Sequence, residues 1–376
     1  MNAENIKTLL AEWQQLQPLK EQLQHQMDQQ FMFDFNYNSN HLEGNTLTYG
    51  QTKLLLLFGR VEGTALFRDY EEMKAHNVGL EIMKREALDK QRPLSETFIR
   101  ELNSTILAGD FYKTSRDGDY RYKIHTGVYK TRPNSVITPS GAMFDYATPE
   151  ATPSMMAELV EWYHKAECEL LLHPVEIATL FHYRYIRIHP FEDGNGRIAR
   201  LLVNYILRRF GYPMIVIPTA DRSNYLDILG QCDKITGTDP FDGANASIEQ
   251  VAVFVDYIAQ FVEKKLNLAV QFVKGEVRSF SEYHVPEKVV GNQQNKNNIY
   301  ENDPENVPEN VPETMSEKRQ KLIVNFIKMK PNISSTEIAD IFKVNAKTIK
   351  RDFDKLKEKG IITRESGERG GFWKII

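Results

Sequence analysis

The chain has 376 residues, of which 41% are hydrophobic, 11% aromatic and 26% charged. At about 150 residues per domain this length favours two or three domains over one, and the composition excludes collagen, a coiled coil and wholesale disorder. Lys and Arg (47) nearly balance Asp and Glu (51), and a net charge of −4 is too small to make nucleic acid or an anionic membrane the expected partner of the whole chain.

The cysteines and the apolar runs bear on the compartment. Cys168 and Cys232 stand far apart without a Cys/His cluster, so neither a disulfide framework nor a zinc site is indicated. The N-terminus has no basic segment followed by an apolar stretch, and no apolar run reaches the ~18 residues of a membrane-spanning helix. We therefore expect a cytoplasmic protein with no membrane contact.

The elements expected before residue 285 are mostly helices. Apolar residues recur at three- and four-residue spacing, the pattern of helices with a buried face, over residues 5–27, 70–88, 94–107, 153–166, 175–188 and 248–272. Between Thr126 and Thr138 the pattern is instead that of a single β-hairpin. The sequence therefore predicts a mainly α fold, a helical bundle with one β ribbon.

Residues 285–315 differ in composition from everything before them. The stretch is polar, nearly lacks large apolar side chains and repeats Pro-Glu-Asn-Val in tandem. Such a segment cannot bury enough surface to offset its ordering entropy, and its prolines keep it extended. We expect a linker here, between a large body and a small domain over residues 316–376.

The small domain has a charge of its own. Residues 316–376 contain 15 Lys or Arg against 8 Asp or Glu, a balance of +7, which leaves −11 for the body and linker. Helices are expected over residues 318–328, from a capped start at Ser334 and from Asn345, and two β-rich runs flank Gly367. Three helices and a two-stranded wing resemble a winged helix-turn-helix domain.

Basic side chains on the third helix of this domain suit the phosphates of DNA. They are Lys347, Lys350, Arg351, Lys355 and Lys357. Winged helices also serve as protein-docking or dimerisation modules with a solvated basic face, and the sequence leaves these two interpretations equally open.

The loop after residue 188 has the composition of an anion site. Gly194 and Gly196 let a backbone approach an anion closely, and the first amides of the helix that follows have no intrahelical acceptor. Asp193 offers a hard carboxylate for Mg²⁺ that bridges phosphate oxygens, and His189 can accept a proton near neutral pH. Arg197, Arg200 and Asn204 are three and four residues apart, so one helix face presents two guanidiniums and an amide.

This string matches the signature of the Fic family, His-Pro-Phe-x-Asp/Glu-Gly-Asn-Gly/Lys-Arg, at every specified position from His189 to Arg197. The resemblance implies a Fic-type helical bundle with a β-hairpin flap, and transfer of AMP from ATP to a Tyr, Thr or Ser hydroxyl of a protein. By matching positions, His189 is the implied base. The residues implied to bind ATP and Mg²⁺ are Asp193, Gly194, Asn195, Gly196, Arg197 and Arg200, with Asp193 as the metal ligand.

Further residues resemble family positions more loosely. Asn204 and Tyr225 correspond to places near the ribose and adenine, although core packing explains Tyr225 equally well. The predicted hairpin resembles the flap that pairs with the backbone of a target protein through Asn134, Ser135, Val136 and Ile137. Backbone pairing accepts many sequences, so the target is not legible in this chain.

A second motif lies near the N-terminus. Ser39, Glu43 and Gly44 match the inhibitory pattern of the family, Ser/Thr-x-x-x-Glu-Gly/Asn. The resemblance implies that Glu43 pairs with Arg200 and keeps ATP from binding productively. Bifunctional members of the family also allow Glu43 to align a water that removes AMP from a modified target.

These expectations divide the chain into four parts. Residues 1–110 are an N-terminal helical region with the inhibitory motif, 111–284 the catalytic core, 285–315 the linker and 316–376 the winged domain. Auto-modification and a homodimer are implied by the resemblance. The alternative is a transcriptional regulator whose body senses a nucleotide. Phosphate transfer is disfavoured because the loop reads Gly-Asn-Gly-Arg rather than Ala-Asn-Lys-Arg, whereas UTP or GTP as the donor stays open.

Overall fold

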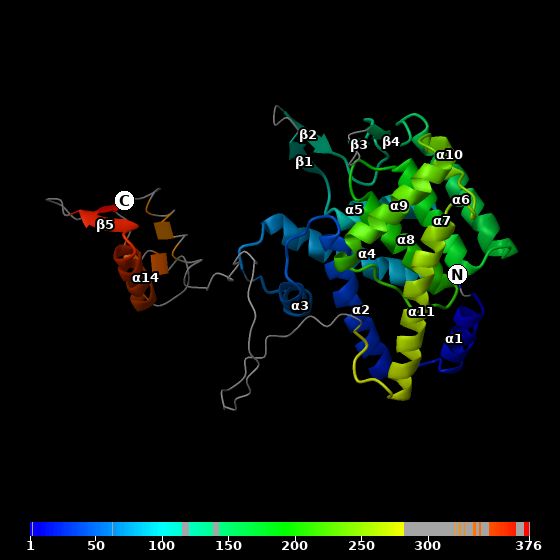
Figure 1. Cartoon of the computed structure of the whole chain (residues 1–376), viewed down its shortest axis with the longest axis horizontal. Helices are drawn as coiled ribbons and strands as arrows, with labels where there is room; N and C mark the ends of the chain where they lie inside the picture. Colours follow the sequence, from blue (N-terminus) through cyan, green and yellow to red (C-terminus); the bar gives the residue numbers. More distant parts are fainter. Residues whose placement is uncertain are drawn as a thin grey trace, which may run out of the picture. The chain divides into compact units, whose positions relative to one another are not determined.

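The computed structural model divides the chain into two compact units, Met1–Val289 and Val290–Ile376 (Figure 1). In the first unit the structure describes residues 1, 3–61, 63–114, 120–137 and 143–281. In the second it describes residues 320, 323–324, 327, 334–335, 338–339, 346–365 and 372–375. The predicted linker, residues 285–315, lies outside the described residues.

The first unit is a bundle of helices, as its sequence predicts. Its elements in chain order are α1 (Ala3–Gln15), α2 (Glu21–His41), α3 (Tyr49–Phe58), α4 (Phe67–Leu88), α5 (Glu96–Ile106), α6 (Thr152–Glu169), α7 (Pro174–Ile188), α8 (Asn195–Arg209), α9 (Arg222–Thr236), α10 (Pro240–Ala244) and α11 (Ala252–Lys274), with a 3₁₀ turn at Thr219–Asp221. In the part of the chain that the structure describes, no helix is both long and apolar enough to cross a bilayer.

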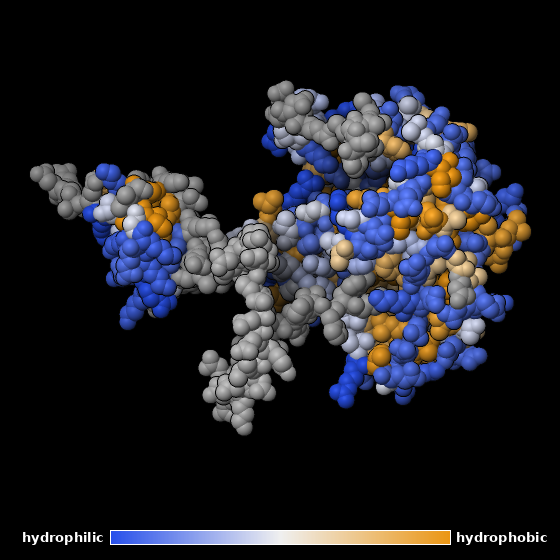
Figure 2. All heavy atoms as spheres, viewed as in Figure 1, coloured by the Kyte–Doolittle hydropathy of each residue, from blue (hydrophilic) through white to orange (hydrophobic). Residues whose placement is uncertain are grey.

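The helices α7 and α8 form the centre of this unit (Figure 1). They pack on one another, and almost every residue of α8 is buried, because α4 and α5 cover one side of it and α2 touches its face. The helices α6 and α11 pack on the far side of α7. The loop from His189 to Gly194 therefore joins two largely buried helices. Polar residues cover much of the visible surface, broken by several hydrophobic patches (Figure 2).

Local signals set where these helices begin and end. Ser95 caps α5 by accepting a hydrogen bond from the Phe98 amide at 3.1 Å. His173 caps α7, and Pro174 occupies its first turn, where a missing N–H does no harm. The stretch 5–27 is two helices rather than one, because Pro18 has no amide hydrogen to continue α1.

The second half of α2 is polar even where it is buried. Asn36, Asn38, Ser39 and Asn40 are each at most 5% exposed. The three asparagines donate from their side chains to backbone carbonyls four residues earlier in α2, each at 2.8 Å. The first half of α2 instead packs with Met27, Phe31 and Phe35 in the hydrophobic core.

The prediction of one hairpin between Thr126 and Thr138 is wrong in number and position. Strand β1 (Phe111–Thr114) pairs antiparallel with β2 (Arg121–Ile124), and β3 (Ser135–Ile137) pairs with β4 (Met143–Asp145). Most of the predicted stretch forms no strand, because its polar groups bind elsewhere: the Gly127 amide donates to the Asn103 side chain and the Lys130 amide to the Pro190 carbonyl, both at 2.9 Å.

The second unit contains the expected third helix and wing. They are α14 (Ala346–Glu358), β5 (Ile362–Glu365) and β6 (Phe372–Ile375), the strands being antiparallel with Ile362 opposite Ile375. Ile349, Phe353, Leu356 and Trp373 form part of a small core, in which the Phe353 and Trp373 rings stack at 4.4 Å. Within the two earlier helices the described residues agree with the prediction: residues 320, 323–324 and 327 are helical, and a helical hydrogen bond from the Ile338 amide to the Ser334 carbonyl, at 3.1 Å, begins at the predicted start.

Candidate active site

The loop from His189 to Gly194 is held by its own side chains. His189 ends α7 in the left-handed conformation (φ 51°), and Gly194 starts α8 in the same region (φ 82°). Asn195 closes the loop, because its side chain accepts a hydrogen bond from the Phe191 amide at 3.0 Å and donates to the Phe191 carbonyl at 2.7 Å. The side-chain amide of Asn195 therefore holds the backbone of the loop together.

An anion position lies above Gly196 at the start of α8. A Cβ atom at Gly196 would collide with Oε1 of Glu43 and press on the Arg200 guanidinium. The Glu43 carboxylate therefore lies where the unpaired amides and the positive end of the α8 dipole favour negative charge. A residue about 150 positions away in sequence fills the anion site.

Arg200 is committed to the end of α2. Its side chain is 4% exposed, and it donates from Nε to the Ser39 hydroxyl at 3.1 Å and from Nη2 to the Ser39 carbonyl and the Glu43 carboxylate, both at 2.8 Å. Burial raises the pKa of Glu43, but Arg200 outweighs it and holds that pKa below its ordinary value. Gly44 follows in the left-handed region (φ 95°) and ends the turn that presents Glu43.

Asp193 stands among cations. Its Oδ1 accepts a hydrogen bond from the Gly194 amide at 2.6 Å and lies 3.4 Å from Arg197, while its Oδ2 lies 2.6 Å from Nζ of Lys113 and 3.9 Å from Arg68. Burial raises the pKa of Asp193, but Lys113 and Arg197 together outweigh it and lower the pKa overall. Asp193 is thus ionised at neutral pH. A single ionised carboxylate fits Mg²⁺, which usually takes one or two protein carboxylates together with substrate phosphates.

Arg197, the first arginine of the motif, is 3% exposed and lies between two carboxylates. It is 3.3 Å from Glu72 of α4 and 3.4 Å from Asp193. The motif thus brings Asp193, Arg197, Arg200 and the glycines together as the sequence predicts. Glu72 had no signal in the sequence, because its place depends on how α4 packs against α8.

His189 is buried and its imidazole is uncharged at neutral pH. Its ring stacks on that of Tyr146, with centroids 4.0 Å apart and planes 20° apart. Burial first, and then the charge of Lys130, lower the pKa of His189 to about 3. The imidazole is therefore unprotonated at neutral pH, and in this setting it binds a proton more weakly than an exposed histidine does.

Lys130 links the flap to the catalytic loop, and sequence reasoning missed it. Its ammonium is 3% exposed and donates to the carbonyls of Ile188 and His189 at 3.1 and 2.9 Å and to the Asn134 side chain at 2.7 Å. Burial lowers the pKa of Lys130 to about 7. Asn134 in turn donates to the Phe191 carbonyl at 3.1 Å. The start of the flap is therefore bound to the end of α7. A lone lysine in a presumed hairpin gives no signal of this role.

The remaining flap residues lie beside it. Ser135, Val136 and Ile137 form β3, and Ser135 is exposed opposite Asp145. The side chains of Val136 and Ile137 lie outside the described residues, whereas the backbone of β3 is described.

Asn204 and Tyr225, which are expected near the nucleotide, are both buried and bound to protein groups. Burial raises the pKa of Tyr225 to about 12, and Arg200 and Glu43 lie close enough to act on that pKa as well. Asn204 is 1% exposed and donates to the carbonyls of Arg200 and Ile215 at 3.2 and 3.0 Å, while its side-chain oxygen accepts from the Ile215 amide at 2.7 Å. It fixes the segment after α8 rather than facing the loop. Tyr225 is 4% exposed and its hydroxyl bonds His182 at 2.8 Å, as the core-packing interpretation predicts.

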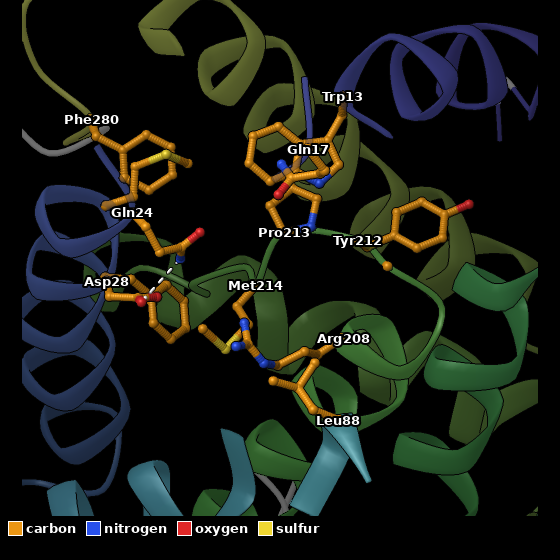
Figure 3. Close-up of a pocket in the computed structure, with 13 residues that line it drawn as sticks. Trp13, Gln17, Gln24, Asp28, Leu88, Arg208, Tyr212, Pro213, Met214 and Phe280 are labelled. Atoms are coloured by element: carbon orange, nitrogen blue, oxygen red, sulfur yellow. Dashed lines mark hydrogen bonds between the residues drawn. The ribbon is translucent and has the colours of Figure 1, made fainter. Parts of the chain in front are cut away.

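A cavity of about 440 Å³ lies between the first half of α2 and the end of α8, away from the loop (Figure 3). Aromatic and apolar side chains make up much of its wall, and Arg208 and Asp28 contribute charge. None of the predicted site residues lines it. We therefore place the chemistry at the loop and not in this cavity.

Comparison with known proteins places this site in a family. A model of the Fic/DOC family matches residues 93–207, and a model of a DeoR-like helix-turn-helix domain matches residues 319–369. The crystal structure of a Fic domain containing signaling protein from Bacteroides thetaiotaomicron is 56% identical, covers 74% of this chain and 99% of its own, and superposes with a TM-score of 0.69. The chain belongs to the Fic/DOC family.

More distant Fic relatives carry the name of an activity. The protein adenylyltransferase fic-1 of Caenorhabditis briggsae is 31% identical over 195 residues, which are 51% of this chain and 35% of that protein. The chain spans well under half the length of the curated relatives it matches. A solved fragment of Caenorhabditis elegans Fic-1 has the same fold, with 24% identity, 73% coverage of each chain and a TM-score of 0.57.

Proposed function

We propose that this Fic protein transfers AMP from ATP to a Tyr, Thr or Ser hydroxyl of a protein, including itself. One observation carries the proposal: an anion position at the start of α8, over Gly196 and against Arg200, lies on the same short loop as a neutral His189. The adenylyltransferase names of the relatives support it.

In this mechanism the oxygen of the target hydroxyl attacks the α-phosphorus while His189 takes its proton. The bond from that phosphorus to the bridging oxygen of the β-phosphate breaks, and diphosphate leaves. Arg197 and Arg200 stabilise the charge that develops on the leaving group, and the amides at the start of α8 hold phosphate oxygens. His189 is already unprotonated at neutral pH, so no prior proton loss is needed.

Mg²⁺ is the proposed cofactor, and Asp193 is the residue that would hold it. The ion would neutralise phosphate charge when bound. The lowered pKa of Asp193 supports this role, because the carboxylate is available as a ligand at neutral pH.

We also propose that Glu43 is an internal brake, with Ser39 and Gly44 shaping the turn that presents it. Its support is the ion pair with Arg200 and the overlap with the anion position over Gly196. ATP with its γ-phosphate at that place would meet a carboxylate and lose Arg200 as a ligand. The brake is tested in the Discussion.

A second role for Glu43 is removal of AMP from a modified target by aligning a water. Its support is the same position beside the phosphate site. Release of AMP from a purified AMP-modified chain by wild type, lost in Glu43→Gly, would support it; equal retention of AMP in both would refute it.

The flap, Asn134 to Ile137, is proposed to pair with the backbone of the target. Its support is the contact of Asn134 and Lys130 with the loop that carries His189, which puts a paired strand next to the base. In domain terms we assign the brake to residues 1–110, catalysis to 111–284, the linker to 285–315 and the winged domain to 316–376.

The winged domain is proposed to bind DNA through α14. Lys347, Lys350 and Arg351 are exposed on this helix, and its surface is strongly hydrophilic (Figure 2). The DeoR-like match supports this choice over protein docking. Salt-dependent binding of the full chain to duplex DNA, lost when the three residues are changed to Glu, tests it. The same binding without any AMP transfer would favour the transcriptional regulator instead.

Mass spectrometry tests the transfer itself. The full chain is incubated with Mg²⁺ and ATP, UTP or GTP, and the added mass identifies donor and reaction together. We expect addition of AMP with Glu43→Gly and none when His189→Ala is added to that variant. Addition should be normal with His25→Ala, which changes an exposed histidine near the start of α2, at the other end of the helix from Glu43. Modification that persists in His189→Ala would refute the assigned base, and no modification with any donor would refute the activity. Dimerisation is checked on the same samples by light scattering.

A further inference from the structure

The hairpin formed by β1 and β2 reaches the catalytic loop from outside the helical bundle. Phe111 and Lys113 alternate with exposed residues along β1, so they share the inner face of the hairpin. The Lys113 ammonium lies 2.6 Å from Oδ2 of Asp193, although its side chain is still 36% exposed. On the partner strand, Lys123 binds Asp110 at 3.0 Å instead. One lysine of the hairpin therefore faces the loop, and a second does not.

A second contact fixes this inner face. The Arg68 guanidinium of α4 lies over the Phe111 ring at 4.2 Å, pairs with Glu72 at 2.6 Å and reaches Asp193 at 3.9 Å. Stacking on an aromatic ring leaves the edge of a guanidinium available for anions. The hairpin and α4 thus present two cations to the same carboxylate.

The charges around Asp193 do not balance. Lys113, Arg68 and Arg197 lie within 4 Å of it, and among the described residues only Glu72 adds a second carboxylate to this group. A fourth cation, Arg200, is balanced by Glu43. Without Glu43, two carboxylates, those of Asp193 and Glu72, remain against four cations. These cations are Arg68, Lys113, Arg197 and Arg200. A cluster with this surplus attracts a polyanion of phosphate type.

We propose that the β1–β2 hairpin is part of the nucleotide site and that Lys113 is a phosphate ligand. In this structure its ammonium is the counter-ion of Asp193; with ATP bound it would donate to a phosphate oxygen next to that carboxylate. An exposed, flexible ammonium with three donors can exchange one oxygen ligand for another at little cost. The proposal rests on the proposed function, because it assumes that the nucleotide occupies this loop.

Nucleotide binding to the full chain tests the proposal without relying on turnover. The parent is the double variant Glu43→Gly, His189→Ala, in which the brake is absent and the chemistry silent. Calorimetry measures the Kd of ATP and of adenosine for the parent, for added Lys113→Met and Lys113→Arg, and for added Lys123→Met as the matched control. A phosphate ligand predicts about tenfold weaker ATP binding for Lys113→Met, partial recovery with Lys113→Arg, unchanged adenosine binding, and no effect of Lys123→Met.

Four results would overturn the proposal. Equal ATP affinity in Lys113→Met and the parent would show that the lysine only balances Asp193. An equal loss of ATP and adenosine affinity would show that it tethers the loop, as would an equal loss with Lys113→Arg. ATP binding that matches the prediction but no AMP transfer in the mass spectra would leave the hairpin proposal standing and refute the proposed reaction. Absence of ATP binding in the parent would refute both the hairpin proposal and the proposed reaction.

Discussion

Replacement of Glu43 tests the brake, and the structure sets the size of the effect. A charge-assisted hydrogen bond contributes about 1.5–3 kcal/mol. The Glu43 side chain is 39% exposed, so solvent screening brings its bond to Arg200 down to about 1–2 kcal/mol. At 1.4 kcal/mol per factor of ten, removal of this contact alone predicts an increase of roughly five- to thirtyfold in the rate of AMP transfer.

Variants of graded size separate charge from volume at this position. Glu43→Gly removes both the carboxylate and the atoms that fill the space over Gly196, so it should give the full increase. Glu43→Gln keeps the volume and loses the charge, so we expect a smaller increase. Ser39→Ala removes one hydrogen bond to Arg200 and should give the smallest. Glu21→Gln, a charge change at the other end of α2, is the matched control and should leave the rate unchanged.

Initial rates of label transfer from ATP to the chain itself measure these changes, and ATP affinity is measured alongside. A rate for Glu43→Gly equal to that of wild type, with ATP binding intact, would refute the brake. A larger increase in Glu43→Gln than in Glu43→Gly would also refute the brake. The Gln side chain still fills the space over Gly196, so it should still hinder ATP more than Gly does.

Three further predictions follow from buried groups. Burial lowers the pKa of Lys130 to about 7, and its neutral amine has only two N–H groups for three acceptors. AMP transfer by wild type should therefore fall as pH rises above 7. A pH–rate profile should show no such fall in Lys130→Arg, which stays charged. Burial lowers the pKa of His182 to about 3, while a histidine in the unfolded chain titrates near 6.5, so stability is lost as pH falls below 6.5. Denaturant titrations from pH 7 to 5 measure how steeply the free energy of unfolding falls with pH. His182→Gln should make that fall shallower by about 1.4 kcal/mol per pH unit. Arg187 is 1% exposed and pairs with Asp233, so Arg187→Met should destabilise the body by about 3–5 kcal/mol, measured as a lower Tm, while Arg187→Lys should lose less.

The loop and the pairing of Glu43 with Arg200 could be predicted from the sequence because their residues are close together or belong to a recognisable motif. The end of α7 follows from Pro190, and the spacing of Arg197 and Arg200 puts both on one helix face. Glu43 was found through its motif, since nothing local links it to α8.

The cations around Asp193 could not be predicted in this way. Arg68 of α4 and Lys113 of β1 reach Asp193 only through packing and strand pairing. Lys130, which lies between β2 and β3, likewise reaches the His189 end of the loop only through the tertiary fold. The hairpin was misplaced because residues 126–133 have the composition of a strand but bind the backbone near Pro190. Asn204 shows the opposite error: its spacing put it on the helix face of the arginines, yet the segment after α8 takes up its side chain.

The asparagines of α2 bear on what the proposed release of Glu43 from Arg200 would require. Each bonds a carbonyl of its own helix, but Asn36 also donates to Asn77 and Asn38 also accepts from the Thr219 amide, both at 2.8 Å. The bonds to other elements would have to be exchanged for bonds to water. An apolar surface at the same place would have to be wetted on every release and dried on every return. The apolar base of α2, with Met27 and Phe31, keeps the helix attached meanwhile. The proposed brake would therefore rest on a helix whose two halves are held differently, the first by apolar burial and the second by hydrogen bonds that water can replace.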